Sequence, residues 1–188
     1  MNNRVRHIAL MAVFSALSIV LKLLSVNLTT VRFLNFSPIT LVLSGYFFGP
    51  FYGLFIGFLT DTVYTFTRPG IWNVFSQPTL FKTILNVLTT FWNLFTVSTM
   101  LWGLSGGLVR KFKRPFIGLL LLLALTAILE TSINTVQMVL WNYPTKVIIT
   151  QLPQRIIQMA FRTPIIIIAA NELIYRLEKT DMIEIYNL

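Results

Sequence analysis

The sequence predicts an all-α integral membrane protein with six transmembrane helices, and three observations support this. Hydrophobic residues make up 55% of the 188 residues and charged residues only 11%, whereas soluble domains carry roughly 25% charged residues. Apolar runs of helical length recur along the chain, separated by turn residues. Basic residues gather beside these runs, as is typical of cytoplasmic helix ends, in three groups: residues 4 and 6, residues 110–114, and residues 176 and 179.

The first three helices are expected at residues 8–25, 37–48 and 51–66. The first run follows a short basic N-terminus and lacks a small-residue cleavage site, so we expect a retained helix with its N-terminus in the cytoplasm. The polar residues between 27 and 35 predict an outer loop. The Gly49-Pro50 pair divides the next two runs, because this dipeptide can turn the chain between helices.

The second half predicts three more spans, at residues 95–109, 116–141 and 154–176. A long outer connection, residues 67–94, lies between helices 3 and 4 and contains an interfacial helix. Residues 142–153 are expected to form a second outer loop. The chain is thus predicted to be a single membrane domain, residues 1–188, with both termini in the cytoplasm.

Small residues mark two places where helices can approach closely. The fourth span contains Gly103, Gly106 and Gly107, and the first contains Ala12 and Ala16 four residues apart. Without large side chains, the backbones of two membrane helices can come into contact. We therefore expect both segments to pack closely against another helix.

Four ionisable residues stand out within the predicted spans: Asp61, Glu130, Arg155 and Arg162. A charged side chain at membrane depth costs several kcal/mol unless it is paired or hydrated, so such residues are candidates for function. For Asp61 the sequence leaves two interpretations open. It either contacts a ligand or neutralises Arg32 or Arg155.

Two polar stripes follow helical spacing on the last two spans. Glu130, Asn134, Gln137 and Trp141 share one face of the fifth span, while Arg155, Gln158 and Arg162 share one face of the sixth. Glu130 and Arg162 are expected at similar depth, which allows a structural ion pair. Alternatively, the stripes line an outward-facing pocket that hydrogen-bonds a polar small molecule.

The outer connection supplies two further candidates, Trp72 and Asn73, which could cap such a pocket by stacking on a flat ligand. An interfacial tryptophan can also serve only as a membrane anchor. No motif for an enzyme, a nucleotide-binding loop or a metal cluster occurs, so we expect no catalytic residue, cofactor or metal. The positive charge is interpreted as membrane topology and not as nucleic-acid binding. Transport against a gradient would then need an ion or another subunit.

Several short motifs follow one another along the chain: Ala12 to Ala16, Val31-Arg32-Phe33, Phe48-Gly49-Pro50-Phe51-Tyr52-Gly53 with Gly57 to Asp61, Phe95 to Thr99 with Gly103, and Leu152-Pro153-Gln154-Arg155-Ile156-Ile157 with Pro164. Their order resembles the folate-type group of substrate-binding S components of energy-coupling factor (ECF) vitamin importers. The similarity covers nearly the whole chain.

The resemblance implies a subunit of the bacterial cell membrane that captures a vitamin from outside and then topples, so that its pocket faces the cytoplasm. Its partners would be a transmembrane coupling subunit, which docks against Ala12 and Ala16, and two ATPase subunits. The expected substrate-binding residues are Arg32, Trp72, Asn73, Glu130, Asn134, Gln137, Trp141 and Arg155.

The vitamin stays open between folate, pantothenate, pyridoxine and the thiamine precursor hydroxymethylpyrimidine. The connection Ile71–Leu94 is longer and more aromatic than in the folate-type pattern. Arg32, Lys146 and Arg155 would suit a carboxylate, which favours folate or pantothenate. The alternative function is a stand-alone, ion-coupled carrier of small solutes.

Overall fold

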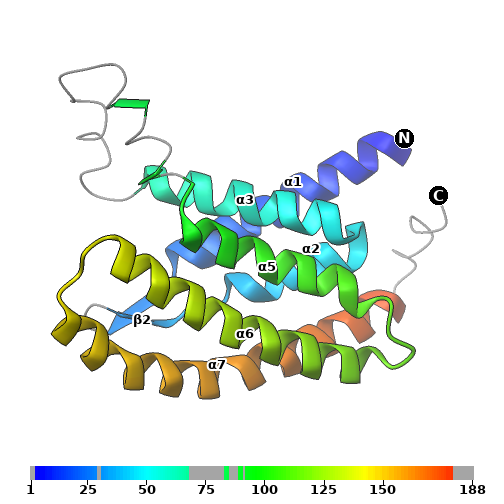
Figure 1. Ribbon diagram of the computed structural model, residues 1–188. Coiled ribbons are helices and arrows are strands. Elements are labelled where there is room, and N and C mark those ends of the chain that lie inside the picture. The colour runs from blue at the N-terminus through cyan, green and yellow to red at the C-terminus, as the bar shows by residue number, and fades with distance from the viewer. Residues whose placement is uncertain (1–2, 29–30, 68–82, 85–88, 91, 180–188) are drawn as a thin grey trace.

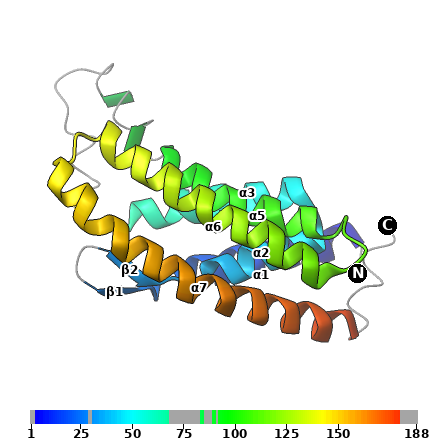
Figure 2. The same cartoon turned by 60° about the horizontal axis from the view of Figure 1, so that its bottom comes forward.

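The computed structural model describes residues 3–28, 31–67, 83–84, 89–90 and 92–179. Within these ranges the chain forms six helices of 12 to 35 residues and one antiparallel hairpin, arranged as an elongated bundle (Figures 1 and 2). In chain order the elements are α1 (Asn3–Leu23), β1 (Val26–Leu28), β2 (Val31–Leu34), α2 (Ser37–Phe48), α3 (Pro50–Phe66), α5 (Leu94–Val109), α6 (Pro115–Leu140) and α7 (Thr145–Lys179).

Helix α2 lies at the centre of the bundle and contacts α1, α3, α5 and α7. Its residues from Leu41 to Gly45 are all buried. Around it pack the apolar side chains of the core, among them Ile56, Trp102 and Leu119. Helix α1, in contrast, packs mainly on α2 and α3, so it lies at the edge of the bundle.

Glycines bring α2, α3 and α5 into backbone contact. A Cβ atom added at Gly103 would lie 2.0 Å from the carbonyl oxygen of Gly53, and one added at Gly106 would lie 2.1 Å from that of Val42. At Gly107 it would meet the backbone of Pro50 at 2.4 Å. The close approach expected of these three α5 glycines is therefore confirmed, because nothing larger than hydrogen fits.

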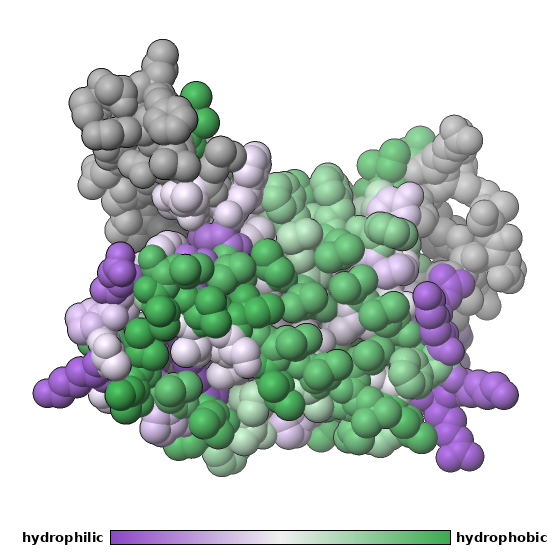
Figure 3. All heavy atoms as spheres, in the orientation of Figure 1, coloured by the Kyte–Doolittle hydropathy of each residue, from purple (hydrophilic) through white to green (hydrophobic). Residues whose placement is uncertain are grey.

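The surface is strongly apolar between two polar ends (Figure 3). Large side chains such as Phe51, Phe161 and Ile168 are 82%, 66% and 66% exposed. Helices α6 and α7 are long and apolar enough to cross a membrane, and α2 and α5 are shorter apolar helices. The start of α1, the α5–α6 connection and the end of α7 lie at the same end of the bundle (Figure 1).

Two expected loops contain regular structure instead. Within residues 27–35, β1 pairs with β2, because the apolar residues Val31 and Phe33 alternate with polar ones at the period of a strand. Helix α7 begins at Thr145 and not at Gln154, so Pro153 lies inside it. The carbonyl of Pro144 starts this helix by accepting hydrogen bonds from the amides of Val147 and Ile148. The helix then continues through Pro153, although proline cannot donate a backbone hydrogen bond. Most of the predicted outer connection 67–94 lies outside the described residues.

Candidate functional site

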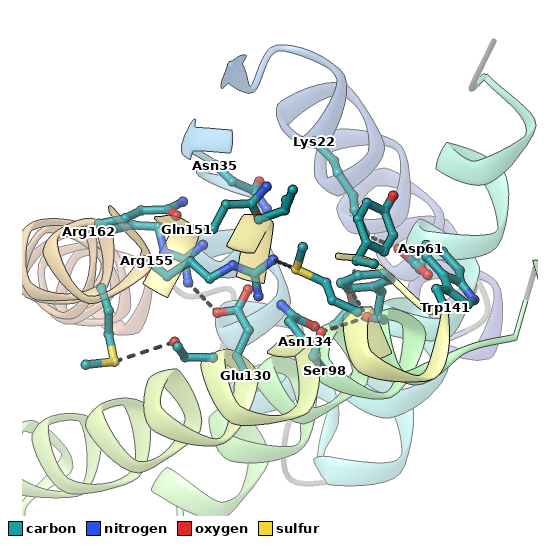
Figure 4. A pocket seen from close by; sticks show the side chains of 18 residues that line it. Lys22, Asn35, Asp61, Ser98, Glu130, Asn134, Trp141, Gln151, Arg155 and Arg162 are labelled. Carbon is teal, nitrogen blue, oxygen red and sulfur yellow. Dashed lines mark hydrogen bonds and ion pairs between the residues drawn. The ribbon is translucent and has the colours of Figure 1, made fainter. Parts of the chain in front are cut away.

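A cavity of about 580 Å³ lies between the described helices, on the side where the α6–α7 turn and the hairpin are found. This volume is within the range of about 300–1,000 Å³ that is usual for small-molecule sites. Side chains from α1, α3, α5, α6 and α7 line it, together with Asn35 from the segment before α2 (Figure 4). Asn35 also starts α2, since its Oδ1 accepts a hydrogen bond of 3.0 Å from the amide of Ser37.

The turn between α6 and α7 places aromatic residues on the cavity wall. Asn142 has a positive φ of 54° and ends α6. Its amide donates to the carbonyl of Val139, and the amide of Tyr143 donates to that of Met138; this is the Schellman pattern of helix termination. Trp141 and Tyr143 both line the cavity as a result, and their rings are stacked with centroids 6.5 Å apart.

Glu130 and Arg162 form an ion pair, one of the two arrangements that their similar depth left open. The Arg162 Nη2 atom donates to Oε2 of Glu130, and the Trp102 indole donates to the same oxygen at 3.1 Å. The Arg162 guanidinium also lies over the Trp102 ring, 5.6 Å from its centroid. Both charged residues line the cavity, so the pair joins α6 to α7 and is at the same time part of the cavity wall.

Asp61 pairs with Lys22, a partner that differs from the expected Arg32 or Arg155. The Lys22 Nζ atom lies 2.5 Å from Asp61 Oδ1 and donates to Thr99 at 3.1 Å. Thr96 donates to the other Asp61 oxygen at 2.6 Å. Lys22 and Asp61 are 4% and 2% exposed, so this network connects α1, α3 and α5 inside the protein.

The reason for this pairing is the position of Lys22 near the end of α1, facing inward. Sequence reasoning did not single it out, although Ser15, Ser18 and Lys22 are spaced i, i+3 and i+7, the same pattern that identified the polar stripe on α7. Ser18 and Lys22 are indeed buried, and Ser15 is partly buried. A polar stripe on an otherwise apolar helix was therefore the available signal.

Two other predicted residues face the cavity beside these pairs. The side-chain oxygen of Asn134 is buried without a hydrogen-bond partner in the described part of the chain, and so is Nε of Arg162. Arg155 places its Nη2 atom 2.8 Å from the sulfur of Met138. Buried polar atoms normally have partners, so these groups are available to a bound polar molecule.

Gln137 shares the helical face of Glu130 but does not line the cavity. It is buried, and its Oε1 accepts a hydrogen bond of 2.9 Å from the amide of Leu94 at the start of α5. The first amides of a helix have no partner within the helix. Together with Asn93, which accepts from the amide of Phe95, Gln137 supplies the missing acceptors.

The remaining predicted residues lie elsewhere. The backbone of Arg32 is on β2, opposite Asn27, but its side chain is not among those described. Trp72 and Asn73 fall outside the described residues. Ala12 and Ala16 are both exposed on α1, so neither is buried by the packing of the described residues.

The model of one protein family, the substrate-specific component of ECF transporters, matches residues 6–176. The chain belongs to this family. No curated protein matches it. As an ECF S component, it is a membrane transport subunit and not an enzyme, and its family implies a vitamin ligand and an ECF module with membrane and ATPase components. The resemblance inferred from the order of sequence motifs is thereby confirmed at the level of the family.

Proposed function

We propose that this S component captures a small water-soluble vitamin, or a vitamin precursor, from outside a bacterial cell in the described cavity. The main support for this proposal is a cavity of about 580 Å³ in which buried polar atoms of Asn134 and Arg162 have no hydrogen-bond partner in the described part of the protein. A bound molecule with complementary hydrogen-bonding groups would satisfy them. The proposed substrate-binding residues on the described wall are Glu130, Asn134, Trp141 and Arg155.

Trp141 and Arg155 suit two different parts of such a ligand. Trp141 packs edge-on against Phe95, with ring centroids 5.4 Å apart, and presents an aromatic surface on which a flat ring can stack. The guanidinium of Arg155 can donate two parallel hydrogen bonds to a carboxylate. Folate and pantothenate carry a carboxylate, whereas pyridoxine and hydroxymethylpyrimidine would depend on amides and stacking.

The proposed topology has six membrane crossings and both termini in the cytoplasm. The basic residues 110–114, 176 and 179 lie at the end of the bundle where α1 begins, opposite the α6–α7 turn. This separation follows the positive-inside rule and directs the cavity side of the bundle outward. The protein would then topple in the membrane and release the vitamin inside, driven by the ATPase subunits through the coupling subunit.

We assign docking of the coupling subunit to the exposed face of α1 around Ala12 and Ala16. Replacing either alanine with tryptophan should abolish ATP-dependent uptake in proteoliposomes while leaving vitamin affinity unchanged. Ile168→Trp, at an exposed position of α7, is the matched control and should transport normally. Loss of vitamin binding by a folded Ala12 or Ala16 variant would overturn the docking assignment.

Binding to the detergent-purified protein tests the proposed function directly. We would titrate folate, pantothenate, pyridoxine and hydroxymethylpyrimidine while following tryptophan fluorescence. Saturable binding of one vitamin is expected, with a signal that disappears in Trp141→Phe. The signal should persist in Trp92→Phe, since Trp92 is exposed and does not line the cavity.

Absence of binding by all four vitamins to a folded sample would contradict this proposal. Uptake by proteoliposomes that contain this chain alone, driven by an ion gradient, would instead favour the stand-alone carrier.

A further inference from the structure

We propose that the substrate brings a single negative charge into the cavity, and that this charge is a carboxylate paired with Arg155. The inference rests on the proposed function and narrows the substrate class. It excludes substrates that enter the cavity uncharged, and it places any second carboxylate of a substrate outside the cavity.

The first step is the charge of the cavity wall. Among the described lining residues, three are cationic, Lys22, Arg155 and Arg162, and two are acidic, Asp61 and Glu130. The described wall therefore carries one net positive charge. Lys146 does not belong to it, because this residue is exposed near the start of α7 and does not line the cavity.

Four of the five charges cancel in pairs. Lys22 binds Asp61, and Arg162 binds Glu130. In Figure 4 the two pairs lie on different sides of the cavity, with Arg155 between them. Each carboxylate also accepts a hydrogen bond from a further donor, Thr96 for Asp61 and Trp102 for Glu130, so the charge of each acidic group is already compensated within the protein.

Arg155 differs from the other two cations. In the described part of the chain it forms no ion pair with a carboxylate. The Glu130 carboxylate attracts it electrostatically but is already paired with Arg162, and the Arg155 Nη2 atom is directed at the thioether of Met138. A thioether is a weak hydrogen-bond acceptor with no charge, so it does not neutralise the guanidinium. Arg155 is only partly exposed, and removing an unpaired charge from water is unfavourable.

A ligand carboxylate would complete this arrangement. It would neutralise the wall and form charge-assisted, bidentate hydrogen bonds with the guanidinium. An uncharged ligand would cover Arg155 without compensating it. A second carboxylate inside the cavity would add one uncompensated negative charge, since Lys22 and Arg162 are already paired.

Two matched ligand series test the inference with the same fluorescence titration. The first compares pantothenate with its uncharged alcohol, pantothenol. The second compares the diamide of folate, the γ-monoamide of folate and folate itself, which carry no, one and two carboxylates on the same skeleton. In the series that binds, the first carboxylate should strengthen binding about 10- to 100-fold, as expected for a hydrogen bond to a charged group, and the second should change it by less than about threefold.

Charge-changing variants provide a second, independent measurement. Arg155→Gln should remove the preference for pantothenate over pantothenol, or for the γ-monoamide of folate over its diamide. Glu130→Gln raises the charge of the described wall by one and keeps an acceptor for Trp102, so it should strengthen binding of folate relative to its γ-monoamide. Asp61→Asn should act in the same direction. Lys146→Gln is the control and should leave all these ratios unchanged.

The outcomes separate the inference from the proposed function. Equal affinity for the charged and uncharged members of a series, or tight binding of pyridoxine or hydroxymethylpyrimidine, would overturn the single-carboxylate inference and leave the vitamin-binding function intact. A further tenfold gain from the second carboxylate in the wild type would also overturn it. Failure of a folded sample to bind any of these compounds would overturn both.

Discussion

Removing the positive member of the Glu130–Arg162 pair should destabilise the protein more than removing both members. Arg162→Met leaves the Glu130 carboxylate without its cation inside the bundle, where the side chain of Glu130 is 15% exposed and that of Arg162 is 8% exposed. A buried charge that loses its partner costs about 3 kcal/mol or more. Glu130→Gln on the Arg162→Met background removes that charge, and the amide still offers an oxygen to the indole of Trp102.

The magnitude follows from these contacts. We expect Arg162→Met to lower the free energy of unfolding by about 3 kcal/mol, and the added Glu130→Gln change to recover about 1–3 kcal/mol of it, a coupling typical of side chains in direct contact. The exposed pair Arg176–Glu172 is the matched control. Arg176→Met should cost less than about 1 kcal/mol because water screens that pair.

Reversible unfolding by SDS in mixed micelles, followed by circular dichroism, measures Arg162→Met, Glu130→Gln, the double variant and Arg176→Met. The reasoning is refuted if the double variant is less stable than Arg162→Met, or if the two single changes add without coupling. Comparable losses for Arg176→Met and Arg162→Met would also refute it, since burial would then make no difference.

Three further predictions follow from the packing and the site. Gly103→Ala should prevent folding or strongly lower the unfolding temperature, because its Cβ would meet the Gly53 backbone at 2.0 Å. Gly118→Ala should have a milder effect, because its Cβ would meet the side chain of Phe112 at 2.9 Å. Equal melting temperatures of the two variants would contradict the close packing of α3 and α5. Gln137→Ala should lower stability by about 1–3 kcal/mol through loss of the acceptor for Leu94 and leave vitamin affinity unchanged, as denaturation and titration would show. Asn134→Ala should instead weaken vitamin binding by about 1–3 kcal/mol, and unchanged affinity would remove Asn134 from the site.

Hydropathy and turn residues predicted the positions of most helices to within one or two residues. Helix α2 has the predicted bounds 37–48. Helices α3 and α5 each begin one residue before the predicted start, and α6 is shifted by one residue at both ends, whereas α1 begins five residues before its predicted start and ends two residues before its predicted end. Apolar runs, Gly-Pro turns and basic flanks are local signals, so they can be read along the chain. Pro153 misled the prediction of α7, because whether a proline interrupts a helix depends on its surroundings as well as on its own backbone.

The site was predicted in part. Spacing on α6 and α7 identified Glu130, Asn134, Trp141 and Arg155 as residues of one wall, and each lines the cavity. The polar stripe on α1 could have indicated that Lys22 is buried, but its pairing with Asp61 depends on how α1 packs against α3. Gln137 accepts a hydrogen bond from the amide of Leu94 at the start of α5. Helical periodicity cannot predict this contact, because it depends on how α5 packs against α6.

The most direct test is to identify the small molecule that stays bound to the protein when it is purified from cells. The protein is purified in mild detergent from bacteria grown in vitamin-rich medium, and its extract is analysed by mass spectrometry beside Arg155→Gln and Lys146→Gln samples. The account predicts a carboxylate-bearing vitamin in the wild-type and Lys146→Gln samples and its depletion from Arg155→Gln. A folded wild-type protein that carries no vitamin, and takes none up when folate or pantothenate is added, would contradict the central claim.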